Sequence, residues 1–183
     1  KLLSSIENIY KRGGWQMKFS VGVEYAIHCL IYMVEMEEGK SIGIHDLASF
    51  QGISDSYLSK TFAKLAKAGI VKSSPGIRGG YSLGRSATDI TFWDIIEAIE
   101  GKDPFFRCQE IRRNNRLLNQ DHLPEGYTKS PCLISEVMHE GQNQMKEYLQ
   151  KKTIYWLYDE VYNHQYTKEQ REKTVEYFNS HCW

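Results

Sequence analysis

Two groups of side chains in this 183-residue chain have the types and the spacing to do chemistry. The first is a basic, hydroxyl-rich stretch between Ser54 and Ala87, where one acid, Asp55, accompanies six basic residues: Lys60, Lys64, Lys67, Lys72, Arg78 and Arg85. A surface that binds DNA phosphates needs such a local excess of positive charge, because each neutralised phosphate releases condensed counterions. The stretch therefore predicts DNA contact, although the net charge of the chain is zero. The alternative is a solvated basic helix face.

The second group is the cysteines, which stand at the irregularly spaced positions 29, 108, 132 and 182. In a chain of this size, that spacing argues against a secreted disulfide framework and for a reducing compartment, so we expect a cytoplasmic protein. Cys29 falls in an apolar segment and is expected to pack in the core, and no role is expected for Cys182. Cys108 and Cys132 remain as candidates for a sensing centre.

The stretch 42–85 contains the elements that would position the basic group. A helix is expected from Ile44 to Phe50, with Gly52 after its end, and Ser54 is expected to cap a second helix that stops at Ala68–Gly69. The second helix has an apolar stripe that is predicted to be buried: Tyr57, Leu58, Phe62 and Leu65. Its polar side chains are predicted to face outward: Ser56, Ser59, Lys60, Lys64 and Lys67.

Two short strands, Ile70–Ser73 and Tyr81–Leu83, are expected around a glycine-rich turn, GIRGG. Two helices followed by such a hairpin form a winged helix-turn-helix, which places its second helix in the DNA major groove. The rival reading, a phosphate-binding loop, lacks the glycine spacing of a nucleotide fingerprint. We therefore predict a mainly α fold with a small β-wing.

Helical spacing of apolar residues also predicts elements on both sides of this stretch. A helix is expected over Phe19–Met36, another from Thr91 to Glu100, and a short one over Thr167–Phe178. A long helix over 132–161 carries an apolar stripe that includes Ile134, Val137 and Met138, and such a stripe usually needs a partner. We therefore expect a dimerisation helix. No apolar run approaches the roughly 20 residues that would span a membrane.

The chain divides into five predicted parts, of which the first, residues 1–16, is expected to be a non-native leader. The segment KRGGWQM back-translates to a purine-rich run just before a methionine codon, so it resembles a translated ribosome-binding site, and Met17 is the expected native start. The other parts are a DNA-binding domain over 17–101, a sensor loop over 102–131, the dimerisation helix over 132–161 and a helical tail over 162–183.

Four segments in combination carry a family resemblance: MKFSVGVEYAIHCL, SDSYLSKTFAKLAKAGIVKS, GGYSLGR and ITFWDIIEAIEG. They resemble the Rrf-two type (Rrf2) winged-helix transcription regulators, the bacterial superfamily of IscR, NsrR and CymR, over Met17 to about Tyr158. The resemblance implies a homodimer whose long helix crosses to the partner subunit. It also implies binding to double-stranded DNA at a near-palindromic operator.

The resemblance implies recognition-helix contacts from Ser54, Ser56, Tyr57, Ser59 and Lys60, and the outward Lys64 adds a basic group to that list. Hydroxyls serve base edges or phosphates, and lysines mostly hold phosphates. Many members carry an arginine in the wing that enters the minor groove. Proline stands there in this chain, so we expect the nearest arginine, Arg78, to take over that contact.

Many members also hold an iron–sulfur cluster in the loop before the dimer helix, usually through cysteine thiolates. The three closely spaced loop cysteines of many members are absent here, which leaves Cys108 and Cys132. One branch of the family is similar in using two widely spaced cysteines, together with a glutamate and a histidine from the DNA-binding half. Glu24 matches that glutamate. The implied cofactor is a [2Fe–2S] cluster.

The histidine position of that branch is occupied by Gln51, a poor iron ligand. His28, one helical turn after Glu24 and on the same face, is the expected substitute, and His45 on the neighbouring helix is an alternative. The alternatives without a metal are that Glu24 pairs with a lysine and that His28 is a core histidine with its hydrogen bonds satisfied.

Three classes of function follow from these residues. The first is a transcription regulator, expected to be a repressor, whose operator binding responds to the redox state or presence of the cluster. The second is a regulator without a cluster, controlled by a Cys108–Cys132 thiol switch, a partner protein or a small molecule. An enzyme is not expected, because the sequence offers no nucleophile–base pair, zinc-ligand spacing or nucleotide loop.

Overall fold

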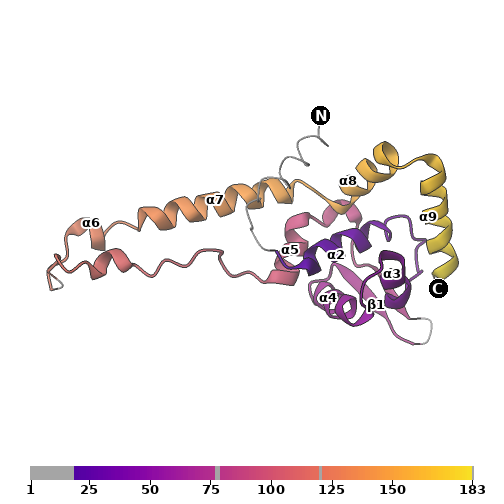
Figure 1. Cartoon of the computed structure of the whole chain (residues 1–183), viewed down its shortest axis with the longest axis horizontal. Coiled ribbons are helices and arrows are strands. Elements are labelled where there is room, and N and C mark those ends of the chain that lie inside the picture. Colours follow the sequence, from indigo (N-terminus) through magenta and orange to yellow (C-terminus); the bar gives the residue numbers. More distant parts are fainter. Residues whose placement is uncertain (1–18, 77–78, 120, 183) are drawn as a thin grey trace.

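The computed structural model describes residues 19–76, 79–119 and 121–182. The leader predicted for residues 1–16 and the wing residue Arg78 lie outside the described residues. The chain forms a compact head and a long arm that projects from it (Figure 1). The arm is the antiparallel pair of a helix and an irregular segment, and both chain crossings between arm and head lie at the same end of the head.

The head is built around the predicted helix-turn-helix. Its helices are α2 (Val21–Ile31), α3 (Ile44–Gln51), α4 (Asp55–Lys67) and α5 (Phe92–Glu100). The α4 stripe of Leu58, Phe62 and Leu65 is completely buried, as predicted. Tyr57 was expected in this stripe, but it is 37% exposed and packs edge-on against Tyr25 of α2. The fourth inward position of α4 is filled by Thr61 instead.

The wing is an antiparallel pair of strands, β1 (Val71–Ser74) and β2 (Gly80–Leu83), each within one residue of its predicted bounds. Ile42, just before α3, extends this sheet by exchanging two backbone hydrogen bonds with Tyr81, at 3.0 and 2.8 Å. Gly80 passes so close to the Ile42 carbonyl that a Cβ atom would collide with it. The wing is therefore fixed to the start of the helix-turn-helix.

Helix ends follow the predicted signals in two of three cases. Gly52 ends α3 with a φ of 65°, a conformation that glycine adopts without strain. Thr91 begins α5 with a capping box, in which its hydroxyl accepts from the Asp94 N–H and the Asp94 carboxylate accepts from the Thr91 N–H. Ser54 occupies the N-cap position of α4, but its hydroxyl bonds to the Ser56 hydroxyl at 3.0 Å instead of capping the helix.

The arm consists of α7 (Leu133–Gln150) and the preceding segment. In the described residues of that segment, the regular structure is limited to short helical turns at η2 (Ile111–Asn114) and α6 (Glu125–Thr128). The predicted loop character of this segment is therefore confirmed. The two sides of the arm are joined near the head by the Phe105 N–H, which donates to the Gln142 side chain at 3.0 Å.

The helix predicted over 132–161 is wrong in its C-terminal part, because the chain leaves the helix after Gln150. The Phe92 N–H donates to the Lys152 carbonyl, and the Ile154 N–H donates to the Ile90 carbonyl, each at 2.9 Å. These bonds require extended backbone around Thr153, which then caps α8 (Ile154–Asp159). After α8 the helix widens into a π-helix, η3 (Glu160–Gln165). Earlier in the chain, a 3-10 turn, η1 (Ala87–Asp89), packs against α8.

The C-terminal helix α9 (Lys168–His181) begins at Thr167 as predicted and runs three residues beyond its predicted end. Phe178 stacks on Tyr32 and contacts Phe50, with ring centroids 4.8 Å apart in both pairs. Cys182 was expected to have no role, but it is buried and pairs with the backbone of Ile42. The C-terminal tail therefore packs against α3 and against Ile42, which precedes it. No helix in the described ranges is long and apolar enough to cross a membrane.

We expect Phe178→Ala to lower the free energy of unfolding by about 3–5 kcal/mol, the usual cost of deleting a buried phenylalanine. Urea denaturation followed by tryptophan fluorescence measures this change. Leu117→Ala is the control, because Leu117 is 93% exposed and its truncation should change stability by less than about 0.5 kcal/mol. Equal effects of the two substitutions would contradict the packing of α9 on the head.

Candidate DNA-binding surface and cysteine centre

The N-terminal half of α4 presents a polar, exposed surface. Ser54, Ser56, Ser59 and Lys60 are all exposed, and Tyr57 adds its partly exposed ring. Helix-turn-helix proteins contact base edges with the N-terminal residues of their second helix. The burial of the opposite α4 face in the core fixes this set of side chains outward, so the predicted recognition residues share one accessible surface.

Lys64 was predicted in the same set, but its ammonium group is engaged within the head. It donates to the carbonyl of Ile99 in the last turn of α5, at 2.7 Å. The last carbonyls of a helix lack partners in the helix and carry partial negative charge, so they attract a cation. Lys64 therefore joins α4 to α5, and we leave it out of the proposed DNA contacts.

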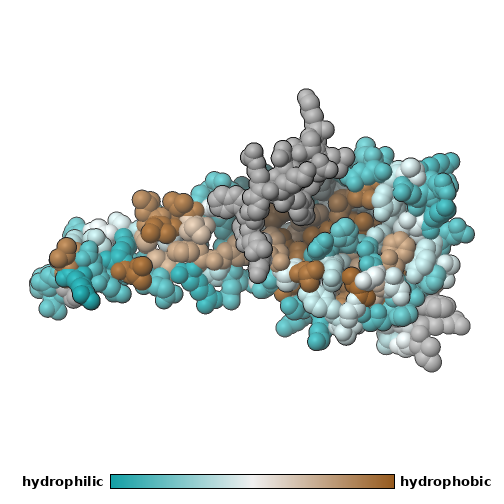
Figure 2. Space-filling view, viewed as in Figure 1, coloured by the Kyte–Doolittle hydropathy of each residue, from teal (hydrophilic) through white to brown (hydrophobic). Residues whose placement is uncertain are grey.

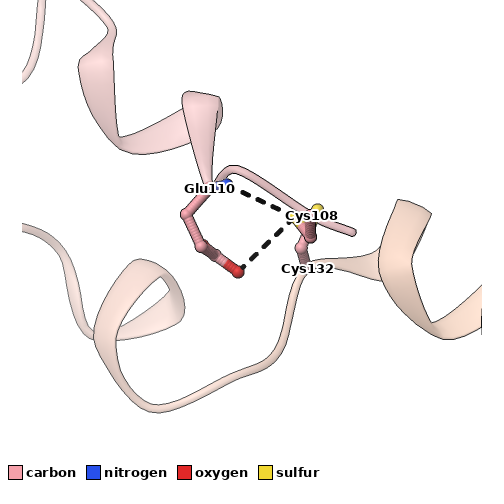
Figure 3. A group of neighbouring side chains, drawn as sticks. All are labelled: Cys108, Glu110 and Cys132. Atoms are coloured by element: carbon pink, nitrogen blue, oxygen red, sulfur yellow. Dashed lines mark hydrogen bonds between the residues drawn. The ribbon is translucent and has the colours of Figure 1, made fainter. Parts of the chain in front are cut away.

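A second candidate site lies on the arm, where Cys108, Glu110 and Cys132 come together (Figure 3). The two sulfur atoms and a carboxylate oxygen all lie within 4.8 Å of one another. Cys132 is buried at the N-cap position of α7, and Cys108 lies half-buried on the facing segment. The predicted pair of cysteines is therefore joined by a third donor that the sequence analysis missed.

Glu110 is held beside Cys108 by local hydrogen bonds. Its N–H donates to the Cys108 sulfur at 3.4 Å, and the Cys108 thiol donates to its carboxylate at 3.8 Å. Among the described residues other than glycine, Glu110 has the only positive φ, 51°. The available signal in the sequence was a carboxylate two residues after Cys108, and it did not show that the two side chains face each other.

Arg112 holds the two sides of the arm together at this site. Its guanidinium donates to the Glu110 carboxylate at 2.9 Å and to the Ser130 carbonyl at 2.6 Å. A further hydrogen bond of 3.3 Å reaches the Gly126 carbonyl. One side chain thus connects the segment that carries Cys108 with the segment that leads into Cys132.

The surroundings of the two thiols shift their pKa values in opposite directions. The pKa of Cys132 is lowered, chiefly because the Ser135 N–H at the start of α7 bonds its sulfur, with help from Ile134, Cys108 and Arg112. The Glu110 N–H also favours a charged Cys108, but desolvation and Cys132 outweigh it and raise the Cys108 pKa. Arg112 lowers the pKa of Glu110. Of the two thiols, Cys132 therefore loses its proton at the lower pH.

Neither Glu24 nor His28 joins this group within one chain, because both are exposed on α2 in the head, whereas the cysteines lie on the arm. The core alternative for His28 is wrong for the same reason. His45 bonds Asp55 at 2.8 Å and also lies in the head. Cys29 is buried as expected, and burial raises its pKa to about 12, so it stays a neutral thiol.

The fold and the exposed α4 surface define a winged helix-turn-helix DNA-binding protein. The family described as "Rrf2: Iron-dependent Transcriptional regulator" matches residues 19–160. The chain therefore belongs to the Rrf2 family of transcriptional regulators, which is not a family of enzymes, and the resemblance seen in the sequence is confirmed.

Individual relatives agree with this assignment. YffB of Lactococcus lactis, named as an HTH-type transcriptional regulator, is 30% identical over 81% of this chain and 92% of its own length. IscR of Escherichia coli is 33% identical, over 51% of this chain and 57% of its own length.

Solved structures share the fold at lower identity. CymR of B. subtilis, titled the global cysteine regulator, superposes with a TM-score of 0.57 at 24% identity, over 79% of this chain and 98% of that chain. IscR of T. potens superposes with a TM-score of 0.60 at 22% identity, over 84% of this chain and 94% of that chain. These likenesses confirm the predicted mainly α fold with a two-stranded wing.

In reduced, metal-free protein, we expect Cys132 to react with iodoacetamide at a lower pH than Cys108, because the thiolate is the reactive form. The pH midpoint of labelling at each site, read by mass spectrometry of peptides, measures the order. Arg112→Ala should raise the Cys132 midpoint, because the guanidinium favours the thiolate.

Arg85→Ala serves as the control for charge loss, because Arg85 pairs with Asp94 in the head at 3.0 Å and should leave both midpoints unchanged. Identical midpoints for the two cysteines would contradict the arrangement described for the arm.

Proposed function

We propose that this chain is a dimeric transcriptional repressor whose operator affinity is set by a [2Fe–2S] cluster held at Cys108 and Cys132. The observation that carries the proposal is the convergence of two thiols and a carboxylate on the arm of a DNA-binding protein. The family description as iron-dependent supports iron as the metal. The cluster would supply a redox-sensitive group that the side chains alone lack.

The donor atoms fit such a group in type. Cysteine thiolates are the usual ligands of iron–sulfur clusters, and the lowered pKa of Cys132 favours the ligating form of that thiol. Arg112 places a positive charge beside the Glu110 carboxylate and near the two thiols, which lose their protons when they bind metal. Cys108, Glu110 and Cys132 would hold the group, and Arg112 would orient Glu110.

One chain provides three donors in this group, so a four-ligand site needs a further ligand. Glu24 and His28 are exposed on α2 and are available to the arm of a second copy. Either residue would then link the arm of one subunit to the helix-turn-helix of the other.

A second copy also suits the exposed face of α7. None of its residues is buried, and four large apolar side chains near its start are open to solvent: Leu133, Ile134, Val137 and Met138. Apolar side chains gather on this part of the arm in Figure 2. A contiguous apolar stripe on an extended helix is typical of a helix–helix interface, which supports a homodimer through α7.

A series of direct contacts connects the arm to the DNA-binding surface. Residues 152–154, just after α7, pair with residues 90–92 at the start of α5. The last turn of α5 in turn accepts the hydrogen bond from Lys64 of α4. In a dimer, operator half-sites lie about 34–36 Å apart, so a small change in the spacing of two α4 helices costs affinity. This is a two-state hypothesis about coupled sites.

The proximity of the two sulfur atoms also favours a second candidate, a reversible thiol switch. In that case an oxidant such as a peroxide would accept two electrons while Cys108 and Cys132 lose two protons and form a disulfide. Its thiolate partner would be Cys132, because that thiol has the lower pKa.

Protein purified without oxygen should be brown and contain roughly equal iron and acid-labile sulfide. We expect Cys108→Ala and Cys132→Ala each to abolish the visible absorbance, because each removes a thiolate ligand. Absorbance spectra and metal and sulfide analysis per subunit make the measurement.

Cys29→Ala is the matched control, because Cys29 is buried in the head and should leave the iron content unchanged. Glu24→Gln, His28→Gln and Glu110→Gln then identify the remaining ligands by their loss of iron. A colourless protein that takes up no iron, but loses two hydrogens in mass on oxidation, would replace the cluster by the thiol switch.

For the DNA-binding surface, we expect Lys60→Ala to weaken binding to every duplex sequence and to reduce the slope of log affinity against log salt by about 0.9 per lost phosphate contact. Fluorescence anisotropy with a labelled duplex over a range of salt concentrations measures this. Lys129→Ala is the control, because Lys129 pairs with Glu125 at the tip of the arm. An unchanged slope for Lys60→Ala would remove Lys60 from the interface.

A further inference from the structure

His45 and Asp55 form a hydrogen-bonded pair across the turn between α3 and α4. The His45 Nδ1 atom lies 2.8 Å from a carboxylate oxygen of Asp55. His45 is the second residue of α3, and Asp55 is the first residue of α4. The two side chains are 77% and 54% exposed. The pair therefore faces solvent at the end of α4 that carries the recognition serines.

Stability alone gives little reason for this pair. Ion pairs between exposed side chains contribute little to folding, because water and salt screen them. The position of Asp55 is also unfavourable for DNA binding, since it lies between Ser54 and Ser56 in the sequence, at the exposed start of α4, and its carboxylate would repel phosphates. A cation beside it would cancel that repulsion.

We propose that His45 is a DNA phosphate contact, held by Asp55, whose protonated form strengthens operator binding, so that affinity falls as the pH rises. The proposal rests on the proposed DNA binding by α4. The first helix of a helix-turn-helix crosses the DNA backbone, which is where His45 stands. Because Asp55 occupies Nδ1, the Nε2 atom is left for an outside ligand.

The charged groups that face the imidazole are Asp55 from α4 and Asp46 from its own helix. The hydrogen bond to Asp55, then the charges of Asp55 and Asp46, raise the pKa of His45 above its ordinary value. A bound phosphate would raise it further. The contribution of His45 to binding is therefore at full strength below the pKa of the free protein and is lost as the pH rises through the pKa of the complex.

The test uses a fluorescently labelled 30-base-pair duplex of mixed sequence as the probe, because phosphate contacts do not depend on sequence. Affinity is measured by anisotropy from about pH 6 to about pH 8.5 at constant ionic strength. We expect the affinity of the wild-type protein to fall roughly three- to tenfold over this range, since a one-unit pKa difference between free and bound protein corresponds to tenfold.

His45→Gln should remove most of this pH dependence while leaving the far-ultraviolet circular dichroism and the urea midpoint unchanged. Asp55→Asn should move the pH transition lower and increase affinity at high pH, because it removes the repelling charge. His164→Gln is the matched control: His164 is exposed on η3 and should leave the pH dependence intact.

The same pH dependence in His45→Gln as in the wild-type protein would overturn the proposal, and so would a wild-type affinity that does not change with pH. In both cases DNA binding by α4 would stand, because the wild-type protein still binds the duplex. Absence of binding by the wild-type protein at every pH would overturn both the DNA-binding function and the role of His45.

Discussion

The backbone pairing of residues 152–154 with residues 90–92 is the constraint on which the arrangement of the whole chain depends. Two hydrogen bonds of 2.9 Å interrupt a segment whose apolar spacing would otherwise continue the helix. The pairing fixes the end of α7 beside the start of α5, so the arm leaves the head in one direction. It also directs the following chain back to the head, where α8 packs against α2 and α9 packs on Tyr32. This pairing thus fixes where both the arm and the tail join the helix-turn-helix.

Within the arm, the cysteine centre depends on two elements that are each weak alone. The start of α7 supplies backbone N–H groups to Cys132, and Arg112 holds the opposite segment by bonds to Glu110 and to two carbonyls. A segment with so little regular structure has few backbone bonds of its own to fix three donors. The guanidinium, with several donors in a rigid plane, replaces that missing structure. The centre is thus positioned by a side chain rather than by a sheet or a helix pair.

The sequence was sufficient to predict the helix-turn-helix, the wing and the caps of α5, because those elements are encoded by local periodicity and by turn residues. It was not sufficient to place Tyr57, whose apolar ring fits a buried stripe equally well until Thr61 is seen to fill the inward position. The break at Thr153 was also hidden, since it depends on pairing with Thr91, 62 residues earlier in the chain. Glu110 escaped notice for a related reason: its position beside the sulfur atoms depends on Arg112 and on a left-handed backbone conformation, and neither is visible as a motif.

A chain with no net charge can still bind a polyanion when its carboxylates are placed away from the binding surface. Here several acidic residues form ion pairs with lysines one helical turn away, as in Glu125–Lys129 at the arm tip and Glu169–Lys173 on α9. Those pairs remove negative charge from the long-range field without occupying α4. Asp55 is the acid that does stand at the recognition end of α4, and it is the one that faces a histidine instead of a lysine. A lysine there would cancel the charge at every physiological pH, whereas a histidine cancels it only while protonated. The choice of residue at position 45 therefore decides whether the field at the end of α4 is constant or depends on pH.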